Sequence, residues 1–143
     1  MNSAVAEDRG VEVASGAISA NDWVTFTDEV KIKVLSVDEG RHSVEFLLKI
    51  AAGYNSGMHR HTCETHVLVL EGKVINHTNG CEFGPGDYCY QPYNDEHVEE
   101  FVEETTVYGS YRGDQDTIVE FLDESGEICG EFKVSDIAAA LPS

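Results

Sequence analysis

From residue 23 onward, apolar and polar residues alternate over short runs, which is the pattern of half-buried β-strands. Residues 30–35 (VKIKVL) are the clearest example, because their apolar and charged side chains fall on opposite faces of a strand. The other runs of this kind cover residues 23–26, 43–51, 66–70, 73–77, 87–90, 97–101, 105–111 and 117–122. Turn residues separate these runs, so the pattern predicts an all-β sandwich or barrel.

The two ends of the chain depart from this pattern. Residues 1–20 are small, polar and aperiodic, which predicts a flexible N-terminal arm, and residues 21–143 have the usual size of one domain. Near the C-terminus, Ser135 is a suitable N-cap for a short helix over residues 136–141, and Pro142 would end that helix.

Composition and charge exclude several classes of partner. The formal net charge is -18, from 27 acidic and 9 basic residues, so the chain should repel nucleic acid and anionic membranes. Apolar runs such as 67–70 are far too short to span a bilayer. Because the first residues lack a basic start and an apolar stretch, we expect a cytoplasmic protein. Its four cysteines form no CxxC pair and are expected to be free thiols.

Histidines are the main candidates for chemistry. Three of the six lie between residues 59 and 66. His59 and His61 are two residues apart, so on a strand both imidazoles point to the same face. Neutral imidazole is a common ligand of transition metals. An isolated pair of this kind is more often chance or a surface feature, and its context therefore decides how it is interpreted.

That context resembles a known superfamily. The segment 53–72, which contains the histidine pair, resembles the first cupin motif, and the segment 85–97 (PGDYCYQPYNDEH) resembles the second. The resemblance extends over about residues 43–111. It implies an all-β fold, a single small cupin (jelly-roll) β-barrel with a short C-terminal helix. It also implies one divalent metal ion inside the barrel, with His59, His61 and His97 as its ligands.

One departure from the cupin pattern affects the expected ligand set. Most metal-binding cupins carry a glutamate ligand four or five residues after the second histidine, and here those positions hold Thr65 and His66, while Glu64 lies one residue too early. Either three histidines complete the protein's ligand set or His66 is a fourth ligand. Counted back from Gly72, the inward position falls on Thr65, which would turn His66 to the other face unless the strand bulges.

A closer resemblance concerns the reaction. The runs 59–72, 86–97 and 121–130 are similar to the cupin dioxygenases that cleave 2,4'-dihydroxyacetophenone and to those that cleave acetylacetone. Both groups use a three-histidine, non-haem ferrous site. The resemblance implies an oxidoreductase that uses O2 to cleave the C–C bond next to the carbonyl of a hydroxyketone or a β-diketone. Ligand softness favours a transition metal and leaves Zn, Ni or Mn open beside Fe(II).

Further site residues follow from strand parity and residue type. Glu99 is two residues after His97 and is a candidate to orient a histidine. The candidates for an aromatic substrate site are Met58, Tyr90, Phe101 and Tyr108, although core packing explains each of them equally well. Arg60 lies between the two histidines and is expected to face away from them, in a salt bridge.

Two other functions are compatible with the same barrel. One is a non-enzymatic metal-sensing or ligand-binding cupin, like the cupin domains fused to zinc-binding anti-sigma regions. The other is a cupin isomerase or epimerase, because a fold alone does not define a reaction. The resemblance also implies a homodimer or homotetramer. Tightly bound zinc without O2 chemistry would favour the sensor.

Overall fold

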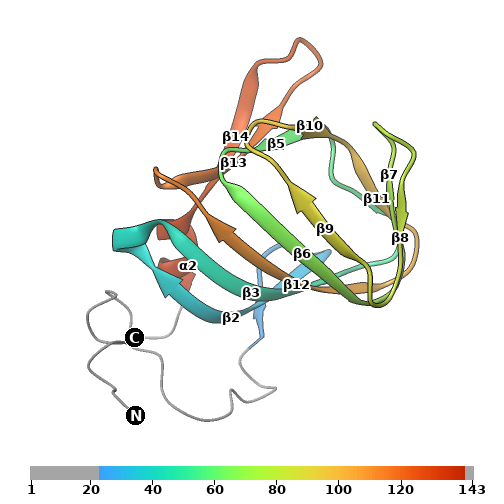
Figure 1. Cartoon of the computed structure of the whole chain (residues 1–143), viewed down its shortest axis with the longest axis horizontal. Helices are drawn as coiled ribbons and strands as arrows, with labels where there is room; N and C mark the ends of the chain where they lie inside the picture. Colours follow the sequence, from blue (N-terminus) through green and yellow to red (C-terminus); the bar gives the residue numbers. More distant parts are fainter. Residues whose placement is uncertain (1–22, 141–143) are drawn as a thin grey trace.

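The computed structural model describes residues 23–140 (Figure 1). The described chain is mostly β-structure, with one 3-10 turn, η2 (Glu39–Arg41), and one short helix, α2 (Val134–Ala140). The strands, in chain order, are β1 (Val24–Thr25), β2 (Val30–Asp38), β3 (Ser43–Ile50), β4 (Tyr54–Asn55), β5 (His59–His61), β6 (Glu64–Glu71), β7 (Val74–Asn76), β8 (Glu82–Phe83), β9 (Tyr88–Gln91), β10 (Glu96–His97), β11 (Glu99–Phe101), β12 (Thr105–Arg112), β13 (Thr117–Leu122) and β14 (Ile128–Lys133).

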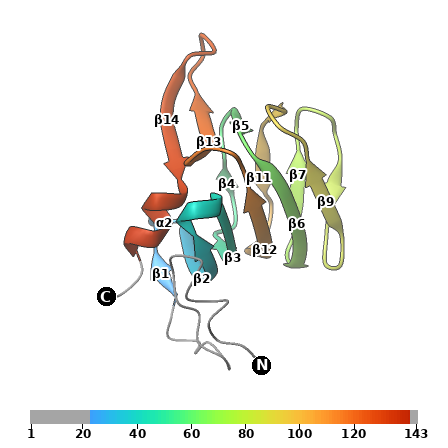
Figure 2. The same ribbon diagram turned by 60° about the vertical axis from the view of Figure 1, so that its left-hand side comes forward.

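These strands form three antiparallel sheets. The largest has the order β1-β2-β3-β12-β6-β9, and the two smaller sheets have the orders β10-β5-β13-β14 and β4-β11-β7-β8. Sequence neighbours are often not sheet neighbours, as expected of a jelly roll. Figure 1 shows the long strands of the largest sheet side by side, and Figure 2 shows the β13–β14 hairpin extending away from the barrel.

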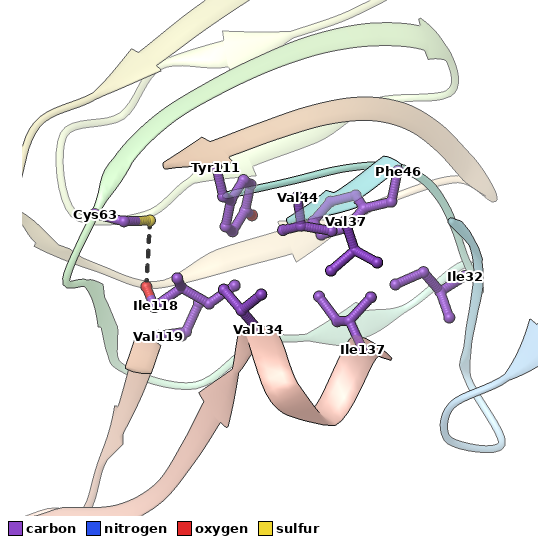
Figure 3. Close-up of a cluster of buried hydrophobic side chains, with 10 residues drawn as sticks. All are labelled: Ile32, Val37, Val44, Phe46, Cys63, Tyr111, Ile118, Val119, Val134 and Ile137. Atoms are coloured by element: carbon purple, nitrogen blue, oxygen red, sulfur yellow. Dashed lines mark hydrogen bonds between the residues drawn. The ribbon is translucent and has the colours of Figure 1, made fainter. Parts of the chain in front are cut away.

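The hydrophobic core lies inside the barrel toward the end that α2 covers. Phe46 and Tyr111 come from adjacent strands of the largest sheet and pack edge to face, with ring centroids 4.9 Å apart. The helix contributes the buried Val134 and Ile137, which belong to the same cluster as Ile32 (Figure 3). Burial of each such side chain contributes about 1.5–3 kcal/mol to folding. The helix therefore closes one end of the core.

The start of the helix differs from the sequence-based expectation. The helix begins at Val134, and Ser135 lies in its first turn rather than at its N-cap. Asp116 accepts hydrogen bonds from the Ser135 backbone N–H (3.0 Å) and hydroxyl (2.6 Å), and Asp136 accepts one from the Lys133 N–H (3.0 Å). Asp116 is distant in sequence, so the local pattern does not reveal its role.

The all-β fold with a C-terminal helix is confirmed. The pattern missed strand β14, whose residues are mostly exposed or half-buried and show no apolar alternation. It pairs with β13 through backbone hydrogen bonds, which leave no mark on side-chain periodicity. The predicted arm at residues 1–20 and the predicted helix end at Leu141 and Pro142 lie outside the described residues.

Candidate metal centre

Strand β5 presents His59 and His61 to the barrel interior. The two side chains alternate with Arg60, and they are 5% and 4% exposed. The β5 strand is central in its sheet, between β10 and β13. Because both of its edges are paired, its register, and with it the direction of each imidazole, is fixed from two sides.

His97 joins the pair from the neighbouring strand. It lies directly opposite His59 in the β10–β5 register and is 1% exposed. Directly opposed residues of antiparallel strands share a face and have Cβ atoms about 5 Å apart. The ring centroid of His97 is accordingly 4.5 Å from that of His59 and 5.3 Å from that of His61. The fold therefore brings His97, which is distant in the sequence, next to the pair His59 and His61.

Arg60 faces away from the histidines, as the strand parity predicts. It lies opposite Glu96 on one side and opposite Glu120 on the other. Its guanidinium donates to the carboxylate of Glu120 at 2.7 Å and to that of Glu96 at 3.1 Å. This three-residue charge cluster links β10, β5 and β13 on the outer face, and it favours the register that places the histidines inside.

Contacts at the Nδ1 atoms orient the imidazole rings of His59 and His61. The Nδ1 atom of His59 is 3.0 Å from the carbonyl oxygen of Gly57. A carbonyl only accepts hydrogen bonds, so Nδ1 carries the proton and the Nε2 lone pair is free. The Nδ1 atom of His61 is 3.2 Å from the hydroxyl of Thr65, which can either accept or donate this hydrogen bond. Such contacts typically orient metal-binding histidines and set their tautomer.

Burial also favours the neutral form of these two rings. Desolvation lowers the pKa of His59, and it lowers the pKa of His61 well below its ordinary value, with a further lowering from the charges of neighbouring histidines. Desolvation also acts to lower the pKa of His97, but the carboxylates of Glu99 and Asp95 outweigh it and the net shift is upward. Neutral imidazoles can donate lone pairs to a cation at neutral pH.

The donor set fits a transition-metal ion. One ligand atom from each of His59, His61 and His97 lies within 4.8 Å of the other two. The Nε2 atoms of His61 and His97 are buried and have no hydrogen-bond partner. Buried polar nitrogens without partners are costly, and a shared cation is the arrangement that would satisfy them together.

Glu99 lies beside this cluster. Its Oε1 atom is 3.7 Å from His59 Nε2 and 3.5 Å from His97 Nε2, and its side chain is 16% exposed. Glu99 therefore lies beside the histidines and not on the outer surface with Glu100. Gln91 lies next to it, with its side-chain amide nitrogen 3.5 Å from Glu99 Oε2.

An apolar cavity of about 330 Å³ adjoins the histidines. His59, His61, Gln91 and Glu99 supply polar groups to its wall. The rest of the wall is largely aliphatic and aromatic, and includes Phe46, Leu48, Val67, Phe101, Val107 and Phe121. An apolar cavity with a few convergent polar groups is the usual form of a small-molecule site.

The structure does not bring every candidate to this cavity. Phe101 lines it, whereas Met58 is 37% exposed and Tyr90 is 50% exposed on the outer face of β9. Tyr108 faces outward and donates its hydroxyl proton to Glu45. Strand parity explains the difference, because neighbouring positions on one strand point to opposite faces.

His66 is also directed away from the three histidines. Its ring lies 3.0 Å from the carboxylate of Glu64 and contacts the hydroxyl of Tyr88, on the outer face of the largest sheet. The pairing of β6 with β12 is continuous from Glu64 to Val69, so no bulge reverses the alternation near His66. Thr65 faces inward instead, as the count back from Gly72 predicts.

Two residues near the site were not singled out as functional from the sequence. Tyr111 is buried, and its ring centroid is 5.3 Å from that of His61. Burial strongly raises the pKa of its phenol, so it is a neutral hydrogen-bonding group. Gln91 is buried at the cavity wall. Gln91 is two residues after Cys89, which also lines the cavity, so both side chains lie on the same face of β9.

The barrel and its inward histidines define the class of protein as a cupin. The chain matches the family model of the ChrR cupin-like domain over residues 12–115. It belongs to the ChrR cupin-like domain family. No curated protein sequence is similar enough to count as a relative. In the part of the chain that the structure describes, no helix is long and apolar enough to cross a membrane.

Solved structures are similar in fold at low sequence identity. An acetylacetone dioxygenase from Acinetobacter johnsonii has a TM-score of 0.76 at 17% identity, with 89% of each chain covered. An RmlC-like cupin protein from Ralstonia eutropha has a TM-score of 0.78 at 20% identity, with 90% of this chain and 85% of that chain covered. A chain in the Rhodobacter sphaeroides complex of SigE with the anti-sigma ChrR has a TM-score of 0.54 at 24% identity, with 62% and 48% covered.

Proposed function

We propose that this cupin is a metal-dependent dioxygenase. In this proposal His59, His61 and His97 hold one divalent ion, Fe(II), and the substrate is a hydroxyketone or a β-diketone that is cleaved next to its carbonyl. The observation that carries the proposal is the cluster of three buried imidazoles, two of which, His59 and His61, line an apolar cavity of about 330 Å³. Likeness in fold to an acetylacetone dioxygenase supports it.

The residues of the site have separable roles in this proposal. A bound ferrous ion would act as a Lewis acid toward the enolised substrate and as a source of electrons for O2. The three histidines would hold the ion. Gly57 and Thr65 would keep the imidazoles of His59 and His61 in the required orientation. Phe101 and the other apolar residues of the wall would exclude water and pack against the substrate.

A metal or ligand sensor without catalysis is the second candidate. Membership of the ChrR cupin-like family favours it, as does the likeness to a chain of the SigE complex with anti-sigma ChrR. The two candidates share the metal ligands and differ in the metal and in O2 chemistry. A sensor needs a tightly held ion, and zinc can fill that role because it has no redox chemistry.

The deciding experiment combines metal analysis with O2 uptake. The protein is purified without added metal, its metal content is measured, and it is then loaded anaerobically with Fe(II). Oxygen uptake is followed with a linear β-diketone and with an aryl hydroxyketone. We expect uptake that is stoichiometric with substrate loss in the wild type and absent in His61→Ala.

The matched control is His77→Ala, because His77 is a half-exposed histidine that pairs with Glu100 on the outer surface. This variant should retain wild-type activity. Retained zinc with no O2 uptake on any carbonyl substrate would contradict the dioxygenase and favour the sensor.

The assembly is also a proposal. We expect a homodimer or homotetramer, and the exposed Leu70, Tyr88 and Tyr90 near the β9 edge of the largest sheet support this expectation.

A further inference from the structure

The carboxylate of Glu99 has the spacing of a metal ligand rather than that of a hydrogen-bond partner. Its Oε1 atom is 3.7 Å from His59 Nε2 and 3.5 Å from His97 Nε2. These separations are too long for good hydrogen bonds. Two ligand atoms that are each about 2.1 Å from one ion lie about 3.4 Å apart at a tetrahedral angle. Each separation is therefore within a few tenths of an ångström of that between two ligands of one ion. Among the described residues, the ligand atoms that all lie within 4.8 Å of one another belong to the three histidines alone, so Oε1 would have to move toward His61 to join the set.

The backbone holds Glu99 in this place. The chain passes from β10 to β11 between His97 and Glu99, and the two side chains, two residues apart, both reach the histidine cluster. Ser56 binds the Glu99 backbone twice. Its hydroxyl accepts from the Glu99 N–H at 3.0 Å, and its N–H donates to the Glu99 carbonyl at 2.9 Å. The side chain thus extends from an anchored position and does not belong to a loose loop.

The two carboxylate oxygens have different neighbours. Oε1 faces the histidines, whereas Oε2 is 3.5 Å from the side-chain amide nitrogen of Gln91. The nearest ring nitrogens to this carboxylate are the Nε2 atoms of His59 and His97. A largely buried carboxylate beside imidazoles is poorly compensated, and a divalent cation between them would supply the missing positive charge.

We propose that Glu99 is the fourth protein ligand of the metal ion, so that the site is three histidines and one carboxylate instead of histidines alone. This inference rests on the proposed metal site. Glu99 lies in β11, just after the second motif (residues 85–97). In the first motif, Thr65 occupies the inward position at which most metal-binding cupins carry their glutamate ligand. With a divalent ion and neutral histidines, this ligand set would carry a net charge of +1.

The test uses Co(II) as a spectroscopic probe and Zn(II) for affinity. Wild type, Glu99→Gln and Glu99→Asp are each stripped of metal and loaded with Co(II), and the visible absorption is recorded. Zinc affinity is measured by competition with a chelator. We expect both variants to change the Co(II) bands. We expect Glu99→Gln to weaken zinc binding about 100-fold or more, beyond the 10–100-fold typical of a residue that only orients a ligand.

Glu99→Asp separates coordination from charge, since it keeps the carboxylate but retracts it by about one methylene group. The matched control is Glu100→Gln, on the same strand but on the outer face, where its carboxylate pairs with His77. It should retain the wild-type spectrum and affinity. Circular dichroism and thermal unfolding of the metal-free proteins establish that all variants fold.

The outcomes distinguish this inference from the proposed function. If Glu99→Gln and Glu99→Asp both give the wild-type Co(II) spectrum while His61→Ala loses the metal, then only the role of Glu99 is overturned. The same holds if the affinity of Glu99→Gln falls moderately without a spectral change. If the wild type binds neither Co(II) nor Zn(II), the metal site itself is overturned, and the proposed function with it.

Discussion

Contacts behind the histidines hold one of the three rings in place. Thr65 is fully buried, and its hydroxyl lies between the Nδ1 atom of His61 and the thiol of Cys63, at 3.2 and 3.3 Å. This chain of contacts leaves the Nε2 atom of His61 as the one directed at His59 and His97. A ring without it would be free to change tautomer or rotate, at a cost in metal affinity.

We therefore expect Thr65→Val to weaken metal binding with little change in shape. Valine has nearly the same volume as threonine but leaves His61 Nδ1 without its partner. Loss of such a contact typically costs 10–100-fold in metal affinity. The measurement is a chelator-competition titration with Zn(II).

Thr117→Val is the matched control for Thr65, because its hydroxyl pairs with Glu131 on the surface and lies away from the site. It should bind zinc like the wild type. An unchanged affinity in Thr65→Val would show that other contacts orient His61.

At the scale of elements, the tight turn between β6 and β7 packs closely against the start of β12. Gly72 sits in this turn with φ of 95°, and a Cβ atom there would lie 2.4 Å from Thr105 Oγ1 and 2.5 Å from the Glu104 carbonyl oxygen. Thr105 also receives a hydrogen bond from the Lys73 N–H at 3.2 Å. The glycine therefore lets the β6–β7 turn approach the segment 104–105 closely.

We expect Gly72→Ala to lower the free energy of unfolding by about 3 kcal/mol, from left-handed backbone strain and steric overlap together. Gly80→Ala isolates the strain, because its φ is 78° and no atom lies within 4 Å of the added Cβ. It should cost only about 1 kcal/mol. Urea unfolding measures both values, and equal losses in the two variants would contradict a specific role for the close contact.

At the scale of the whole molecule, metal binding and folding are linked. The ligands come from β5 and β10, and the proposed fourth ligand comes from β11 in another sheet. A metal ion that binds only the folded protein stabilises it in proportion to the logarithm of its concentration over the dissociation constant. The fold and the site should therefore respond together when the metal is removed.

We expect removal of the metal to lower the melting temperature of the wild type. An excess of metal of about 100-fold over the dissociation constant contributes about 2.7 kcal/mol, which corresponds to roughly 10 °C for a domain of this size. Differential scanning calorimetry with and without a chelator measures the shift. His61→Ala should show no shift, and a wild-type melting temperature that is insensitive to the chelator would argue against a bound ion.

Much of the fold and half of the site follow from patterns that are local in the sequence. Alternation over short runs indicates the strands, and the two-residue spacing of His59 and His61 places both rings on one face. The same parity argument favours Thr65 over His66 as the inward residue. These inferences succeed because the direction of a side chain along one strand depends only on that strand.

Other features depend on which strands become neighbours. His97 lies opposite His59 because β10 pairs with β5. Glu99 lies close to His59 and His97 because the chain passes from β10 into β11, a strand of another sheet, directly after His97. Asp116 caps a helix that is distant in sequence. By itself the sequence determined the β class, the inward face of β5 and the chemistry of the imidazoles. Only the tertiary structure decided that His97 lies opposite His59 and that an apolar cavity adjoins the histidines. Both features arise from pairing and packing between segments that are distant in the sequence, and local periodicity does not encode which segments become neighbours.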